Sequence, residues 1–317
     1  MSHMRPFVLS VLLVLLSALS PAAARTAPSG VCWRPDALKG LPAERATRRH
    51  VPGAHMRPPA LIRYTPMPIP AALRGSIRRV ALPPGVKLLA LTFDLCEANG
   101  EVTGYDGGVI DYLRAHHIKA TFFAGGKWME NHAERAEQLI ADPLFQVGNH
   151  TWSHRNLKKL NGRALEDEIA RGEAAYEQTR SKLAGRACLA PAALARIPAH
   201  LTVFRFPYGT CSPAAMKAVG DAGMTAIQWD VVTGDPAKGQ TAERIAAVVL
   251  RHARPGSIII GHANGKGRET ARALSLFVPK LLAQGYRFVT VGELLAAGKP
   301  VIASTCYEER PGDNDRY

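Results

Sequence analysis

Seven short apolar runs, separated by helical patterns, constrain the fold of this chain most. They are rich in β-branched and aromatic residues and cover residues 88–93, 118–123, 145–148, 203–206, 226–229, 257–260 and 287–291. The clearest amphipathic helical patterns span residues 163–183, 242–251 and 269–283. Strands that alternate with helices predict a parallel sheet. Seven such strands with outer helices favour a barrel, although a doubly wound open sheet would give the same pattern.

The first residues have the pattern of an export signal. Arg5 precedes an apolar run from Phe7 to Leu19, and the small residues Pro21-Ala22-Ala23-Ala24 follow it. This order predicts a secretory signal peptide over residues 1–24, with an uncleaved anchor as the alternative. The run is too short for a comfortable transmembrane helix. We therefore expect a periplasmic or secreted protein.

Composition divides the remaining chain into three parts. Residues 25–83 are rich in Pro, Ala and Arg and lack sustained periodicity, which predicts an extended arm against the barrel or a tether. Residues 84–298 are enough for one large α/β domain. Residues 299–317 form a C-terminal tail whose charged end is expected to fray.

The chain is strongly basic, with a formal net charge of +14. Basic residues gather in the arm, at Arg48-Arg49 and at Arg74, Arg78 and Arg79. An exported basic protein is attracted to anionic envelope polymers or lipid head groups, and we expect no nucleic-acid partner in that compartment. A solvated Arg-rich surface explains the charge equally well. We expect a monomer.

Five cysteines allow at most two internal disulfides in an exported protein. Cys96 lies inside a motif that carries acidic residues and is expected to be the free thiol. Pairing Cys188 with Cys211 would pin a strand-end loop, and pairing Cys32 with Cys306 would tie the arm to the body. We prefer these pairs, but the sequence leaves the connectivity open.

Polar motifs stand at the ends of the predicted strands. They are Thr92-Phe93-Asp94-Leu95-Cys96-Glu97, His150-Thr151-Trp152-Ser153-His154, Phe204-Arg205-Phe206-Pro207-Tyr208-Gly209, Trp229-Asp230 with Asp235, and Gly261-His262. Their order and spacing resemble the five motifs of the polysaccharide deacetylases, carbohydrate esterase family four, over about residues 84–298. The resemblance implies a distorted (β/α) barrel of about seven parallel strands with an N-terminal extended arm.

The two histidines of the second motif are the candidate metal ligands. Residues i and i+4 share a helix face, so His150 and His154 can face one divalent ion if the segment is helical. By itself this spacing more often marks a solvated helix face. The resemblance implies that both histidines bind a metal, with zinc expected and cobalt or nickel as alternatives.

The resemblance also implies a role for each remaining polar residue. Asp94 corresponds to the base that takes a proton from the attacking water, and Arg205 to the arginine that orients that base. The backbone N–H of Tyr208 corresponds to an oxyanion donor. His262 corresponds to the acid that protonates the leaving amine, and Asp235 to the carboxylate that raises the pKa of this histidine.

Two apolar residues are expected to line the substrate pocket. Trp229 is expected to pack under the site, and Ile260 corresponds to a residue of the acetyl pocket. Both would serve equally well as ordinary core residues.

The first motif departs from the family pattern. The family has a second aspartate, a metal ligand, where this chain has Leu95. An aliphatic side chain cannot bind a metal, so we expect Glu97 to reach the ion in its place. Cys96 is a second candidate, because a thiolate suits zinc. It would point to the opposite face if the strand continued.

The sequence therefore predicts a metal-dependent hydrolase of carbon–nitrogen bonds other than peptide bonds. Its expected substrates are N-acetylated, or O-acetylated, sugar polymers or oligomers of the cell envelope. Leu95 motivates one alternative, a metal-independent hydrolase of a non-sugar amide. The basic charge and the same departure motivate another, a catalytically silent envelope polysaccharide-binding protein.

Overall fold

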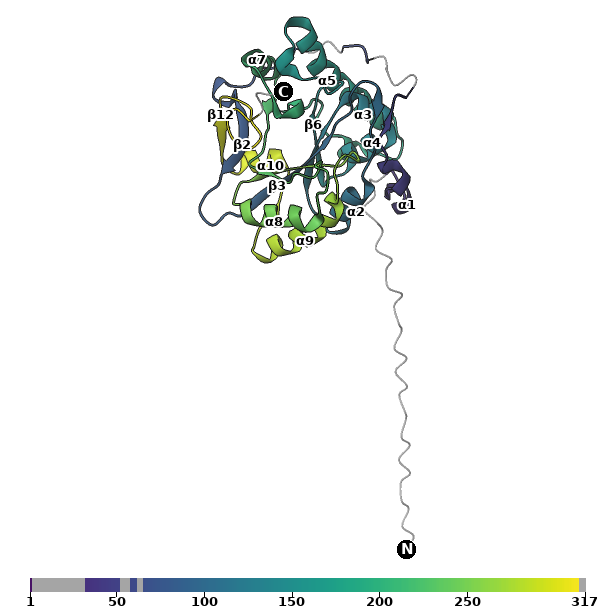
Figure 1. Cartoon of the computed structure of the whole chain (residues 1–317). Helices are drawn as coiled ribbons and strands as arrows, with labels where there is room; N and C mark the ends of the chain where they lie inside the picture. Colours follow the sequence, from purple (N-terminus) through teal and green to yellow (C-terminus); the bar gives the residue numbers. More distant parts are fainter. Residues whose placement is uncertain (2–31, 52–57, 62–64, 314–317) are drawn as a thin grey trace.

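A curled sheet of parallel strands, surrounded by helices, forms the centre of the molecule (Figure 1). This computed structural model describes Met1 and residues 32–51, 58–61 and 65–313. Apart from Met1, the predicted signal peptide, residues 1–24, lies outside the described part. Among the described helices, none is both long and apolar enough to cross a membrane.

The order of the strands confirms the predicted barrel-like fold. The central path runs β8 (Thr225–Ala226), β7 (Val203–Phe204), β6 (Phe145–Asn149), β5 (Ala120–Ala124), β3 (Leu88–Leu95), β10 (Ile258–His262), β9 (Val231–Val232). Every pairing along it is parallel, and β11 (Arg287–Phe288) pairs with the first residues of β3. Strands β7, β8 and β11 are shorter than predicted, and the sequence analysis did not identify β9.

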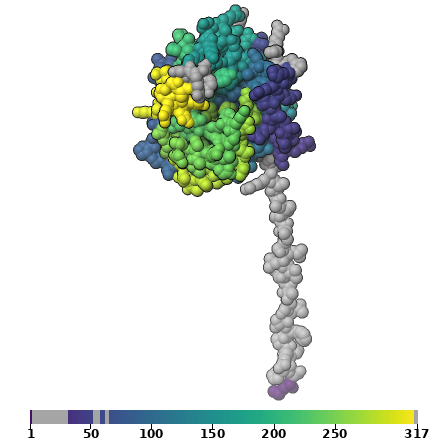
Figure 2. Space-filling model, in the orientation of Figure 1, coloured from purple at the N-terminus to yellow at the C-terminus, as the bar shows by residue number. Residues whose placement is uncertain are grey.

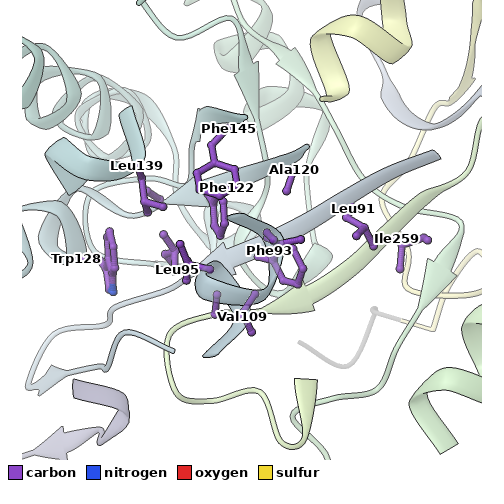
Figure 3. Close-up of a cluster of buried hydrophobic side chains, with 14 of the residues drawn as sticks. Leu91, Phe93, Leu95, Val109, Ala120, Phe122, Trp128, Leu139, Phe145 and Ile259 are labelled. Carbon is purple, nitrogen blue, oxygen red and sulfur yellow. The ribbon is translucent and has the colours of Figure 1, made fainter. Parts of the chain in front are cut away.

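Strand β3 shows how side chains divide between the two faces of the sheet. All of its residues are buried, as expected for a central parallel strand covered on both sides. Side chains alternate along a strand, so Leu91, Phe93 and Leu95 pack toward the outer helices (Figure 3). Leu88 and Ala90 belong to a second apolar cluster on the inner face. By the same alternation Thr92 and Asp94 also belong to the inner face.

The helices connect the strands and cover the outer face. Their bounds are α2 (Gly107–Ala115), α3 (Gly126–Asn131), α4 (Ala133–Ala141), α5 (Gly162–Ala184), α7 (Pro213–Asp221), α8 (Ala242–His252), α9 (Thr270–Ala283) and α10 (Val291–Ala296). Shorter turns are α1 (Pro35–Leu38), α6 (Pro191–Leu194), and the 3-10 helices η1 (Pro42–Arg45), η2 (Ala71–Leu73), η3 (Leu157–Lys159) and η4 (Pro207–Gly209). Helices α5, α8 and α9 match the three predicted amphipathic patterns to within a residue.

The described parts of the predicted arm and of the predicted tail form paired strands. Strand β2 (Ser76–Ala81), in the predicted arm, pairs antiparallel with β12 (Lys299–Ala303), in the predicted tail. Single bridges join Ile77 to Ile227 and Arg79 to Ser257, so β2 also contacts the residues next to β8 and β10. Sequence analysis missed β2 because Arg78, buried in the fold, interrupts its apolar pattern. Farther back, β1 (Arg48–Arg49) pairs with β4 (Glu101–Val102).

Residues 32–51 lie on the surface of the body. Figure 2 shows this segment in purple and the C-terminal strand in yellow, at opposite edges of the visible face. Arg45 fixes the segment by donating hydrogen bonds to the Asp106 carboxylate and to the Gly267 carbonyl, at 2.9 and 2.8 Å. This part of the predicted arm is therefore packed against the barrel.

The preferred disulfide pairing was wrong. The bonds join Cys32 to Cys188 and Cys211 to Cys306, while Cys96 is free and buried, as expected. The N-terminal segment passes beside the loop that follows α5, and the tail returns beside the loop that follows η4. These neighbours depend on the path of irregular segments, which sequence periodicity does not report.

Candidate active site

The predicted site residues meet at the carboxyl ends of the central strands. Asp94, Arg205 and His262 follow inner-face residues of β3, β7 and β10 by even steps, so strand alternation turns all three toward one end of the barrel interior. Functional residues of β/α barrels gather at this end of the strands.

Arg205 and Asp94 form a buried ion pair. Arg205 is fully buried, and its Nη1 donates to Asp94 Oδ1 and to Thr92 Oγ1, each at 2.8 Å. Its other nitrogens donate to the carbonyls of Ile227 and Gln228 at 3.3 and 3.2 Å. Burial lowers the pKa of Arg205, and the charge of Asp94 opposes that shift. The guanidinium therefore holds one oxygen of Asp94 in a fixed position.

The segment of His150 and His154 is a loop rather than a helix. It follows β6 directly, and both Thr151 and His154 have left-handed backbones, with φ of 67° and 53°. Asn149 Oδ1 accepts from the Thr151 N–H, and Thr151 Oγ1 accepts from the His154 N–H, at 2.8 and 3.0 Å. The helical interpretation was therefore wrong, yet the turn still brings the two imidazole rings to 4.9 Å between centroids.

Helix α5 packs closely under this loop. A Cβ added at Gly172 would lie 2.6 Å from Asn149 Oδ1, so only glycine permits the approach. Glu168 accepts hydrogen bonds from the N–H and hydroxyl of Ser153, at 3.0 and 2.7 Å. The helix thus fixes the conformation of the loop that carries the histidines.

The two rings turn toward the end of β3. His150 Nδ1 donates to the Arg205 carbonyl at 2.8 Å, which leaves Nε2 facing Cys96 Sγ at 3.5 Å and Asp94 Oδ2 at 3.8 Å. Ligand atoms of Cys96, His150 and His154 all lie within 4.8 Å of one another, and all three residues are buried. This spacing suits three ligands of one metal ion.

Among the described residues, Glu97 does not belong to the group that the two histidines form. Glu97 Oε2 accepts hydrogen bonds from the N–H and hydroxyl of Thr103, at 3.0 and 3.3 Å, and Oε1 accepts from the Asn131 amide. Strand β3 ends at Leu95, so the chain turns before strict alternation would point Cys96 away. The thiol, and not the longer carboxylate, therefore joins the histidines.

The free thiol has a strongly shifted pKa. Burial raises the pKa of Cys96, but the nearby His154 and His150 rings outweigh burial and lower it well below that of an ordinary cysteine. For His150 burial lowers the pKa, while Asp94 and Cys96 raise it to above its ordinary value. The site therefore favours a thiolate among imidazoles.

His262 and Asp235 form a second buried pair. His262 Nδ1 lies 2.9 Å from Asp235 Oδ1, and the His262 N–H donates to Oδ2 at 2.7 Å. Thr270 and Thr233 hydroxyls also donate to this carboxylate. Burial lowers the pKa of His262, but Asp235, followed by Cys96, raises it well above the ordinary value. This pair can hold a protonated imidazole at neutral pH.

A cavity of about 370 Å³ is lined by Asp94, Cys96, His154, Asp235 and His262. The remaining predicted residues, Tyr208, Trp229 and Ile260, all line it. Tyr208 follows Pro207 with a left-handed backbone, φ 60°, and its ring lies 4.6 Å from the His154 ring. The complete lining is Asp94, Cys96, His154, Tyr208, Gly209, Trp229, Val232, Thr233, Gly234, Asp235, Pro236, Ile260, His262, Lys266 and Glu308.

Sequence analysis did not identify two charged residues of this lining. Lys266 follows β10 by four residues, and Glu308 comes from the C-terminal tail. The position of Lys266, shortly after a strand end, was a usable signal. Glu308 gave none, because its place depends on the return of the tail to the barrel.

Known proteins share both the sequence and the fold of this chain. A family model described as polysaccharide deacetylase matches residues 81–227. A peptidoglycan-N-acetylglucosamine deacetylase from Bacillus cereus is 32% identical over 213 residues, which cover 67% of this chain and 69% of that protein. A chitooligosaccharide deacetylase from Bradyrhizobium is 30% identical over 222 residues, which cover 66% of this chain and 91% of that protein.

Two solved structures illustrate the range of related proteins. A pseudoenzyme of carbohydrate esterase family 4 from Bacillus anthracis has a TM-score of 0.57 at 26% identity, over 71% of this chain and 70% of that one. A family 4 acetyl xylan esterase from Clostridium thermocellum, in complex with cobalt, has a TM-score of 0.52 at 26% identity, over 66% of this chain and 91% of that one.

Proposed function

Since the chain belongs to the polysaccharide deacetylase family, we propose that it is a metal-dependent hydrolase that removes acetyl groups from N-acetylated sugar polymers or oligomers of the cell envelope. The observation that carries this proposal is the convergence of a fixed carboxylate, a charged histidine pair and a three-ligand cluster on one cavity. Amide hydrolysis needs a base, an electrophile and an acid in such proximity.

The cluster of Cys96, His150 and His154 fits a divalent metal. One thiolate and two imidazoles are ligands that zinc prefers, and cobalt also binds them. The hydrogen bond from His150 Nδ1 to the Arg205 carbonyl leaves Nε2 as the ligand atom, an arrangement common for metal-binding histidines. A divalent ion held there would supply Lewis acidity toward the acetamide carbonyl. Leu95, in the hydrophobic core, then needs no ligand role.

We assign the proton transfers to the two buried pairs. Asp94 takes the proton of the attacking water, and Arg205 holds this carboxylate in position through its hydrogen bond. His262 gives its proton to the departing amine, and Asp235 keeps the imidazole charged until then. The backbone N–H of Tyr208 contributes to stabilising the oxyanion. Trp229 and Ile260 form the apolar wall around the acetyl group.

Related proteins support the proposed substrate class. Two relatives are named as a peptidoglycan-N-acetylglucosamine deacetylase and a chitooligosaccharide deacetylase. The structural similarity to an acetyl xylan esterase supports O-acetylated sugars as additional substrates. Two disulfides support a periplasmic or secreted location, where such bonds persist.

A catalytically silent polysaccharide-binding protein is the second candidate. Leu95 stands where the family has a metal-binding aspartate, and the similar Bacillus anthracis protein is a pseudoenzyme. This candidate predicts tight polymer binding without turnover under any metal.

Acetate release from N-acetylglucosamine oligomers separates the two candidates. We expect release by the wild-type protein with added zinc or cobalt. Asp94→Asn and His262→Ala should each abolish release without changing the circular dichroism spectrum. Wild-type protein that binds oligomers but releases no acetate with any divalent metal would contradict the proposed activity. Undiminished release by either variant would contradict the assigned roles.

A further inference from the structure

A basic groove lies next to the active-site cavity. Its volume is about 750 Å³, and it is lined by Arg45, Ala46, Thr47, Arg49, Pro236, Gly265, Lys266, Gly267 and Arg268. Pro236 and Lys266 also line the active-site cavity, so the groove and the cavity are neighbours. An extended ligand in the cavity therefore has a route past these two residues into the groove.

Two closely packed segments build the groove, the N-terminal arm and the loop that follows β10. Gly265 in this loop has φ of 78°, and an added Cβ would lie 1.9 Å from the Arg45 carbonyl oxygen, so only glycine permits the approach. The Arg268 N–H donates to the Asp235 carbonyl at 2.8 Å, which ties the same loop to the active site. Pairing of β1 with β4 holds the backbone of Arg49 on the arm side. The groove is therefore a fixed part of the fold.

The lining of the groove carries more positive charge than the neighbouring carboxylates neutralise. Arg45 and Lys266 form ion pairs with carboxylates that do not line the groove. Arg49 and Arg268 are exposed, and neither side chain forms a hydrogen bond or an ion pair within the described part of the chain. Among the described residues, none that lines the groove is acidic. Two guanidinium groups on its wall therefore remain to bind an anion.

The position and lining of the groove favour a sugar polymer as the source of that anion. Guanidinium groups bind carboxylates through paired N–H donors. Because the groove adjoins the cavity in which the acetylated sugar is proposed to react, another sugar of the same strand would occupy it. A lipid surface instead binds basic residues beside large apolar side chains, and the described lining has only Ala46 and Pro236 as apolar residues. A carboxylated strand therefore fits the groove better than a membrane does.

We propose that the basic groove binds a carboxylate of the sugar polymer, carried by a sugar beyond the acetylated one under attack. This inference rests on the proposed function, which places the acetylated sugar in the active-site cavity. The carboxylate belongs either to a uronic acid ring or to an acidic ether substituent, and both present the same group to Arg49 and Arg268. The protein should therefore bind polymers that alternate acetylated with carboxylate-bearing sugars more tightly than neutral polymers.

Two double variants of equal charge test the groove. Arg49→Gln/Arg268→Gln removes its two unmatched charges. Arg48→Gln/Arg251→Gln removes two exposed charges from outside the lining and is the control. The probes are end-labelled oligosaccharides in which N-acetylglucosamine alternates with glucuronate or with N-acetylmuramate, each compared with a form whose carboxylates are reduced to alcohols. Fluorescence polarisation gives the Kd of each probe and requires no turnover.

We expect the wild type to bind at least one carboxylated probe more tightly than its reduced form. Arg49→Gln/Arg268→Gln should raise that Kd about three- to tenfold, as for two exposed ion pairs, and added salt should reduce the difference. The Kd of the reduced form, and the Kd values of the control variant, should stay nearly unchanged. The probe that shows the preference identifies which of the two carboxylates the groove accepts.

Three outcomes would overturn the proposal. They are a wild type that does not prefer either carboxylated probe, an unchanged Kd in Arg49→Gln/Arg268→Gln, and an equal rise of the Kd in the control variant. If the groove variant lost affinity only for phosphatidylglycerol vesicles, the two arginines would belong to a membrane-binding surface instead. Absence of acetate release would refute only the deacetylase proposal, because acetate is not part of this measurement.

Discussion

Replacing Arg205 with methionine should destabilise the fold by removing one partner of a buried ion pair. Methionine keeps a long side chain against Phe123, whose ring centre lies 4.1 Å from the guanidinium carbon. It leaves the Asp94 carboxylate, which is 4% exposed, without its cation. Breaking a buried pair from one side costs about 3–5 kcal/mol. That is a large part of the about 5–15 kcal/mol by which most domains are stable.

Urea unfolding, followed by circular dichroism on the metal-free protein with intact disulfides, measures this loss. Arg251→Met, at an exposed position of α8, is the control and should change the free energy of unfolding by less than about 0.5 kcal/mol. Adding Asp94→Asn to Arg205→Met should restore part of the lost stability, because the unpaired charge disappears. A loss below about 1 kcal/mol for Arg205→Met, or a further loss in the double variant, would refute the buried-pair argument.

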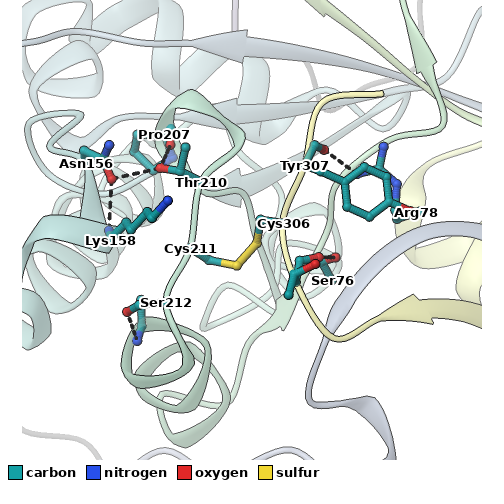
Figure 4. The surroundings of a disulfide bond; sticks show 12 residues. Ser76, Arg78, Asn156, Lys158, Pro207, Thr210, Cys211, Ser212, Cys306 and Tyr307 are labelled. Atoms are coloured by element: carbon teal, nitrogen blue, oxygen red, sulfur yellow. Dashed lines mark hydrogen bonds between the residues drawn. A yellow bond between two sulfur atoms is a disulfide. The ribbon is translucent and has the colours of Figure 1, made fainter. Parts of the chain in front are cut away.

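Three further predictions concern proton binding and the disulfide that holds the C-terminal segment. Because Asp235 raises the pKa of His262, Asp235→Asn should move the alkaline limb of the kcat–pH profile to lower pH; an unmoved limb contradicts this role. Burial raises the pKa of Glu173 from 4.5 to about 8, so wild-type stability from this group should fall as pH rises between those values. Glu173→Gln should remove this dependence. Urea midpoints of wild type and variant that change in parallel between pH 4.5 and about 8 would contradict it. The double variant Cys211→Ser/Cys306→Ser should lose about 2–4 kcal/mol of stability, because it lacks a disulfide that joins residues 95 positions apart (Figure 4). Its KM should also rise. An unchanged KM would show that the C-terminal segment, residues 304–313, does not shape the cavity.

The sequence predicted most of the site because parallel strands impose its position. Asp94, Arg205 and His262 each follow a β-branched or aromatic run, and the carboxyl ends of such strands must meet. The family resemblance implied the pairs Arg205–Asp94 and His262–Asp235, and both are present in the structure. This part of the site therefore needed the order of the strands together with the resemblance.

The sequence named both Glu97 and Cys96 as candidate ligands but could not decide between them, because the choice depends on where a strand ends. Alternation would have turned Cys96 away, but β3 stops at Leu95 and the chain turns. Glu97 is long enough to reach the site, yet the Thr103 N–H and the Asn131 amide bind its carboxylate elsewhere. A backbone turn and a local hydrogen-bond network decided between the two residues.

The irregular segments gave the other errors. Residues 150–154 have the spacing of a helix face but form a loop. The side chains of Asn149 and Thr151 accept hydrogen bonds from the N–H groups of Thr151 and His154, which replace the hydrogen bonds of a helix. The disulfide partners were wrong because neither the N-terminal segment nor the tail carries a periodic signal. For the same reason Glu308 could not be connected to the site from the sequence.

Absorption spectroscopy of the cobalt-loaded protein tests the central claim most directly. A thiolate bound to cobalt gives an intense charge-transfer band in the near ultraviolet, which nitrogen and oxygen ligands do not give. We predict this band at one cobalt per chain in the wild type and in Glu97→Gln, and its loss in Cys96→Ser. Its absence from the wild type, or its persistence in Cys96→Ser, would contradict the assignment of Cys96, His150 and His154 as the metal site.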